Sequence, residues 1–102
     1  MIRVEITRGW IKVNGHAGAG AKGSDPVCAA VSTLAWTLIY GISEVLGIEV
    51  TILREAKGEL EAVWKNDNSR EELVLVETVC GSLREIAKKN PKRIIMNDEC
   101  AS

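Results

Sequence analysis

Apolar and polar side chains alternate in two separate parts of the chain, which is the pattern of half-buried β-strands. In the first part, residues 2–7 alternate, a break containing glycine follows, and residues 11–14 alternate again. In the second part, residues 48–52 and 60–64 alternate on either side of a turn at Lys57-Gly58. Each part therefore predicts a β-hairpin.

A long helix is predicted between the two hairpins. Asp25 supplies a side-chain acceptor for the helix cap, and Pro26 suits the first helical position, where a missing N–H costs nothing. The helix should end near Leu46, with Gly47 as the glycine that commonly follows a helix. Apolar residues at intervals of three and four predict its core face: Val27, Val31, Leu34, Leu38, Ile42 and Val45.

A second helix is predicted after the second hairpin. Ser69 and Glu72 have the spacing of a capping box, in which each side chain accepts the backbone N–H of the other, and Asn90-Pro91 stops the helix. Residues 93–96 predict one last short strand. The order ββαββαβ predicts an α+β fold with two helices packed on a mostly antiparallel sheet. The core face of the second helix should contain Leu73, Val76, Cys80, Leu83 and Ala87.

Length and composition narrow the class of protein. A chain of 102 residues is expected to form one domain, residues 1–102, with a core large enough to fold without stabilising disulfides or metal ions. Hydrophobic residues make up 46% and charged residues 26%, which is the balance of a folded globular protein. The net charge of −1 excludes the polybasic surface of a nucleic-acid or anionic-membrane binder, so neither partner is expected.

The uncharged stretch of residues 27–43 is at the lower length limit of a membrane span. Polar side chains interrupt it, and Asp25 and Glu44 bracket it, so we interpret it as a buried helix. Because apolar and polar residues alternate from the second residue, a secretory leader is not expected, and we expect a cytoplasmic protein.

The cysteines and the histidine are the candidates for chemistry. Cys28 would lie in the first turn of the first helix, where unpaired N–H groups and the helix dipole favour a thiolate. His16, the one histidine, ends the strand before it, so the connecting segment can fold back and bring imidazole to sulfur. The helix-start N–H groups could then serve as an oxyanion hole. The alternative interpretations are a small core residue for Cys28 and a structural or solvated side chain for His16.

The other two cysteines give no comparable signal. Cys80 falls on the apolar face of the second helix, and Cys100 lies in the tail. No CxxC pair is present, so neither a metal site nor a metal cofactor is expected.

A glycine-rich segment joins His16 to the first helix and should be a surface loop, because it contains no large apolar side chain. Residues 18–23 also spell G-x-G-x-x-G, the pattern of a dinucleotide-binding turn. The preceding strand belongs to a hairpin, however, and the helix cap comes after the third glycine, which disfavours that function. The segment comprises Ala17, Gly18, Ala19, Gly20, Ala21, Lys22, Gly23 and Ser24.

Two motifs around these candidates resemble one known family. Asn14-Gly15-His16-Ala17 is followed at a characteristic distance by Gly23-Ser24-Asp25-Pro26-Val27-Cys28-Ala29-Ala30-Val31-Ser32. Both are similar to the signature segments of the ribosomal-processing cysteine protease family, Prp, which the length and the ββαββαβ order also suit. Pro26 stands where other members often have an aliphatic residue, but proline fits the first turn of a helix.

The resemblance implies a cytoplasmic, homodimeric endopeptidase without a cofactor, which removes an N-terminal extension from large-subunit ribosomal protein L twenty-seven. It implies Cys28 as nucleophile, His16 as general base and residues 17–24 as a mobile loop that orders around substrate. Asp25 and Ser32 occupy motif positions of less certain role; we interpret Asp25 first as a helix cap and only second as an orienter of His16. A non-catalytic ribosome-associated binding module and a glycine-loop nucleotide binder are the alternatives.

Overall fold

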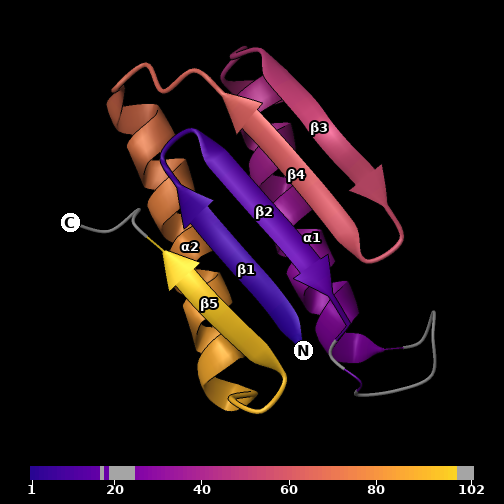
Figure 1. Cartoon of the computed structure of the whole chain (residues 1–102). Coiled ribbons are helices and arrows are strands. Elements are labelled where there is room, and N and C mark those ends of the chain that lie inside the picture. The colour runs from indigo at the N-terminus through magenta and orange to yellow at the C-terminus, as the bar shows by residue number, and fades with distance from the viewer. Residues whose placement is uncertain (17, 19–24, 99–102) are drawn as a thin grey trace.

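Both predicted hairpins form, and they join in one sheet (Figure 1). The computed structural model of this chain describes residues 1–16, 18 and 25–98. The strand order is β3-β4-β2-β1-β5, in which β5 pairs with β1 in parallel and every other pair is antiparallel. The predicted α+β fold and its ββαββαβ order are therefore confirmed. The strands are β1 (Ile2–Thr7), β2 (Trp10–Gly15), β3 (Val50–Ala56), β4 (Glu59–Trp64) and β5 (Ile94–Asp98).

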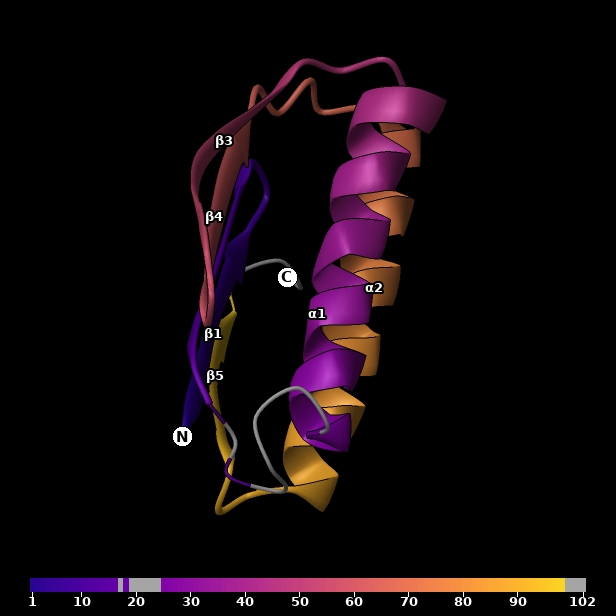
Figure 2. The same cartoon turned by 90° about the vertical axis from the view of Figure 1, so that its right-hand side faces the viewer.

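Two helices, α1 (Pro26–Tyr40) and α2 (Arg70–Lys89), cover one face of the sheet (Figure 2). The alternation in β1 turns every second side chain toward them, and Ile2, Val4 and Ile6 are at most 1% exposed. The polar side chains between them point to the uncovered face, as expected of an antiparallel sheet covered on one side. The elements therefore share one core between the sheet and the helices.

The first helix begins as predicted. Asp25 is its cap, with the carboxylate accepting the N–H groups of Val27 and Cys28, and Pro26 is the first helical residue. By length and composition, Pro26–Val45 is the one helix among the described residues that could cross a membrane. In this fold, however, its apolar side packs against α2 and the sheet, and Val31, Ala35 and Leu38 are buried there.

The end of this helix corrects the predicted core face. α1 continues into a π-helical turn, η1 (Gly41–Val45), in which the N–H of Leu46 donates to the carbonyl of Gly41. One more residue per turn changes the direction of the side chains that follow. Val45, predicted as a core residue, is 70% exposed, while Leu46 packs against the core.

The predicted capping box at the start of α2 is only half formed. Ser69 Oγ accepts the N–H of Glu72 at 3.1 Å, as expected. The Glu72 carboxylate instead lies fully buried, bonded to Arg8 and Trp64, and Asp67 accepts the N–H of Ser69. Sequence spacing identified the cap but not the long-range partners that take the carboxylate.

Candidate active site

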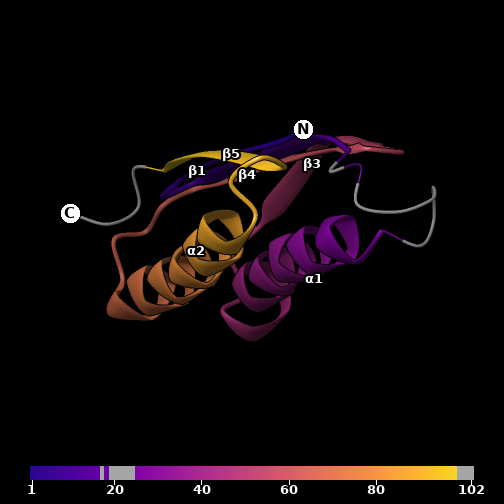
Figure 3. The ribbon, with the colours of Figure 1, turned by 90° about the horizontal axis from the view of Figure 1, so that it is seen from below.

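Three segments meet at one end of the two-layer fold. They are the end of β2, the start of α1 and the turn between β3 and β4; Figure 3 shows the start of α1 beside this end of the sheet. Asn14 pairs with Glu59, so the β3–β4 turn lies beside the end of β2, and the Gly15 N–H donates to the Gly58 carbonyl at 2.8 Å. A cavity of about 840 Å³ opens between these segments. This volume is in the range of ligand-binding pockets.

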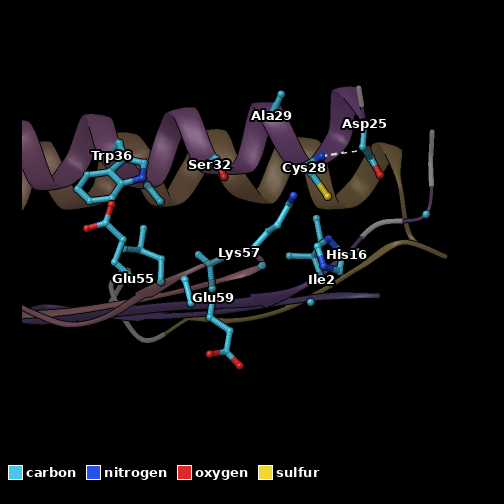
Figure 4. A pocket seen from close by; sticks show the side chains of 17 residues that line it. Ile2, His16, Asp25, Cys28, Ala29, Ser32, Trp36, Glu55, Lys57 and Glu59 are labelled. Atoms are coloured by element: carbon cyan, nitrogen blue, oxygen red, sulfur yellow. Dashed lines mark hydrogen bonds between the residues drawn. The ribbon is translucent and has the colours of Figure 1, made fainter. Parts of the chain in front are cut away.

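The cavity brings the two predicted catalytic residues together. His16, directly after β2, and Cys28, in the first turn of α1, both line it. Figure 4 shows the Cys28 sulfur pointing from the helix toward the sheet side of the cavity, where the exposed His16 ring lies. Cys28 is half-buried, so its side chain is reachable from the cavity. The arrangement places a thiol and an imidazole in one solvent-accessible site.

Asp25 and Ser32 also line this cavity. The Asp25 carboxylate caps α1, which agrees with its primary interpretation as a helix cap. Ser32 lies one turn after Cys28, and its hydroxyl is on the side of the helix that faces the cavity (Figure 4). All four predicted site residues therefore surround one space.

The same cap corrects the predicted oxyanion hole. Asp25 Oδ1 accepts the N–H of Val27 at 2.9 Å and that of Cys28 at 3.1 Å, while the Asp25 carbonyl accepts the N–H of Ala29 at 3.0 Å. Pro26 has no N–H. The donors of the first helical turn are thus already bonded to Asp25, so in this state they cannot also bind an oxyanion.

The cavity contains residues that the sequence analysis did not single out. Lys57 reaches from the β3–β4 turn toward α1, and Trp36 lies with Glu55 at the end of the cavity away from Cys28 (Figure 4). The sequence identified Lys57-Gly58 only as a turn. This turn lies close to His16 because β2 pairs with β4, and no local sequence pattern reveals that pairing.

Most of the predicted substrate loop lies outside the described residues. Gly18, the exception, lines the cavity with a φ of 70°. Ala17 and residues 19–24 therefore stay predictions, as does any role of Cys100. Cys80 is fully buried in the core, as predicted. Within the described residues, no three His, Cys, Asp or Glu side chains gather as a metal site requires.

Comparisons with known proteins match this chain to one family and one fold. Residues 1–95 match the model of the family described as cysteine protease Prp. Among solved structures, the ribosomal processing protease Prp of S. aureus with a covalently linked product peptide is similar, with a TM-score of 0.85 and 24% identity. That match covers 97% of this chain and 100% of the other.

Two further structures have the same fold. The S. aureus protease with a substrate peptide gives a TM-score of 0.80 at 24% identity, again covering 97% of this chain and 100% of the other. SMU.848 from Streptococcus mutans gives 0.79 at 25% identity, covering 96% of this chain and 93% of the other. The chain has no match among curated proteins.

Proposed function

This chain belongs to the cysteine protease Prp family, and from that membership we propose that it is a ribosomal-protein-processing endopeptidase, a single protease domain over residues 1–102. Its proposed substrate is the N-terminal extension of large-subunit ribosomal protein L twenty-seven. The observation that carries the proposal is the shared cavity of Cys28 and His16. The similar S. aureus protease has been solved with a substrate peptide and with a covalently linked product peptide, which supports a peptide substrate.

The proposed reaction is covalent acyl transfer at Cys28. The sulfur attacks the scissile carbonyl carbon as His16 takes the thiol proton, and the carbonyl oxygen receives the electron pair of the broken π-bond. The tetrahedral intermediate then expels the amine of the mature protein, which receives the proton from His16. Water, deprotonated by His16, hydrolyses the remaining thioester, and Cys28 regains its proton when the thiolate leaves.

Stabilisation of the oxyanion requires donors other than those already bonded to Asp25. The Ser32 hydroxyl and the Lys57 ammonium are the candidates, since both extend toward the space below α1, whereas the Trp36 N–H lies at the end of the cavity away from Cys28 (Figure 4). A single lost oxyanion donor typically costs about 10²–10³-fold in kcat. Ser32→Ala and Lys57→Met therefore compare the two, with the larger loss of kcat identifying the principal donor.

The cavity carries a small excess of negative charge. Glu55 and the capping carboxylate of Asp25 line it, against the one ammonium of Lys57, whereas the Glu59 carboxylate points away from α1 and pairs with Arg54 (Figure 4). Complementary charge steers a basic segment into such a site. In the proposal, residues 17–24 close over the bound peptide as the substrate loop.

The proposed protease acts as a cytoplasmic homodimer, without a cofactor, a membrane or direct nucleic-acid contact. Large apolar side chains on the outer side of α1 and η1 support a second copy as partner, since Tyr40 is 63% and Val45 70% exposed. Analytical ultracentrifugation tests this arrangement. Tyr40→Glu should convert a dimer to monomers, whereas a wild-type protein that sediments as a monomer at micromolar concentration contradicts it.

The decisive experiment uses a synthetic peptide that spans the N-terminal extension and the first residues of the mature ribosomal protein from the same genome. Wild type should cleave it and accumulate an acyl-enzyme detectable by mass spectrometry, Cys28→Ala should be inactive, and Cys100→Ala should retain activity. Peptide binding without cleavage would instead favour the binding-module alternative. Saturable binding of ATP or a dinucleotide would favour the nucleotide-binding alternative.

A further inference from the structure

The turn between β3 and β4 lies directly against the imidazole of His16. Gly58, with a φ of 77°, is the second residue of this turn. A Cβ atom built at position 58 would lie 2.8 Å from Nε2 and 2.9 Å from Cε1 of His16. These separations are shorter than real contacts of Cβ atoms. A side chain at position 58 and the present position of the ring are therefore mutually exclusive.

We propose that Gly58 is a positioning residue for the His16 imidazole, in a role that rests on the proposed function. Because Gly58 has no side chain, its backbone can lie directly against the imidazole ring. Its carbonyl accepts the 2.8 Å hydrogen bond from the Gly15 N–H and so holds the end of β2. The β3–β4 turn thus holds the backbone before His16 in place and also limits how far the imidazole ring can move toward β4.

The conformation of the turn does not by itself require glycine. Asparagine also adopts positive φ with little strain, so a turn of this shape can be built without glycine. The Cβ atom of an asparagine at position 58 would instead occupy the space in which Nε2 and Cε1 of His16 lie. The close approach, and not the turn alone, is the reason for glycine at this position.

The consequences for folding and for catalysis differ. His16 is exposed, so its ring can swing away from an added side chain with little disturbance of the core. A general base must remain within about 2.6–3.2 Å of the proton it removes, and a displacement of about 1 Å can lower the rate by about 10²-fold. A substitution at Gly58 should therefore act mainly on kcat.

Gly47 offers a matched control. Its φ of 69° is close to that of Gly58, but a Cβ atom at position 47 would have nothing within 4 Å. Gly58→Ala and Gly47→Ala therefore introduce similar backbone strain, and only the first disturbs the imidazole. Both should lower Tm by a similar amount, about 4–8 °C for a loss typical of this strain.

The experiment measures cleavage of the extension peptide and the NMR signal of the His16 Cε1–H group. That signal needs no further assignment because the chain contains one histidine. Gly58→Ala should lower kcat by about 10–100-fold with KM almost unchanged, and should shift the Cε1–H signal. Gly47→Ala should leave kcat and the signal close to wild type.

A second variant separates strain from contact. Gly58→Asn should be more stable than Gly58→Ala because asparagine tolerates the left-handed conformation, but it should show at least as large a loss of kcat and a shifted His16 signal. If Gly58→Ala and Gly58→Asn both match Gly47→Ala in kcat and in the His16 spectrum while Cys28→Ala is inactive, the positioning role is overturned and the proposed function stands. Full cleavage by Cys28→Ala would instead overturn the proposed function.

Discussion

The Asp25 carboxylate accepts a hydrogen bond from the backbone N–H of Cys28 at 3.1 Å. The side chain that begins α1 therefore also holds the backbone of the proposed nucleophile. Because the same side chain caps the helix and lines the site, a substitution at Asp25 should affect both stability and catalysis.

Replacing Asp25 distinguishes its two interpretations. Asp25→Ala removes the cap and should lower the free energy of unfolding by about 1 kcal/mol, with reduced cleavage because the Cys28 backbone loses its anchor. Asp25→Ser restores a capping oxygen and should recover most of both, since we assign the residue first to capping. Denaturant unfolding measures the stability of each variant, and peptide cleavage measures its activity. A serine variant that is stable but no more active than Asp25→Ala would show that Asp25 orients His16.

Gly41 allows the two helices to approach each other. A Cβ atom there would lie 2.5 Å from Cδ2 of Leu75 in α2. Gly41→Ala should therefore displace the end of the Leu75 side chain and, after the gain in helix propensity, lower the free energy of unfolding by about 1 kcal/mol.

The control for this substitution is a glycine within α2. A Cβ atom at Gly81 would meet nothing within 4 Å, so Gly81→Ala should raise the free energy of unfolding by about 0.5–1 kcal/mol through helix propensity. Urea unfolding of both variants measures the contrast. Equal changes in the two proteins would contradict a tight contact at Gly41.

The buried Glu72 should be one of the most sensitive polar positions for stability. Its carboxylate accepts 2.8 Å hydrogen bonds from Arg8 Nη2 and Trp64 Nε1, which joins the β1–β2 turn, β4 and α2. Glu72→Ala leaves the guanidinium and the indole N–H without this acceptor and should cost about 3–5 kcal/mol. The exposed Glu85 serves as control, because Glu85→Ala should change stability by less than about 0.5 kcal/mol. Comparable losses in the two variants would argue against the buried network.

The Arg84–Asp98 pair should make stability depend on pH in acid. The hydrogen bonds from Arg84, the nearer at 2.8 Å, together with its charge, lower the pKa of Asp98 below the usual value of about 3.9. Asp98 therefore contributes stability that is fully present above about pH 4 and is lost as the pH falls through the lowered pKa.

The comparison of wild type with Asp98→Asn tests this dependence. Because the pair is partly exposed, we expect a difference in the free energy of unfolding of about 1 kcal/mol or less at pH 7, and a smaller one at pH 2–3. Unfolding in urea at both pH values gives the two differences. A difference that grows in acid would have the wrong sign for this ion pair.

The sequence by itself determined the features that depend on near neighbours in the chain. Three such features were predicted without the fold, because each involves groups only a few positions apart. They are the alternation in residues 2–7, the cap at Asp25 and the turn at Lys57-Gly58. The motif around His16 and Cys28 likewise indicated the family and the candidate catalytic residues, and the fold placed both beside one cavity.

Only the tertiary structure decided the features in which distant segments compete for the same group. The Glu72 side chain fits a capping box, but half-buried Arg8 and buried Trp64 donate to its carboxylate, because a buried donor or acceptor left unpaired would cost more. The π-helical turn places Val45 in solvent, against the period of the sequence. The contact of Gly58 with His16 exists because β2 and β4 pair across more than forty intervening residues, a closeness that no local spacing encodes.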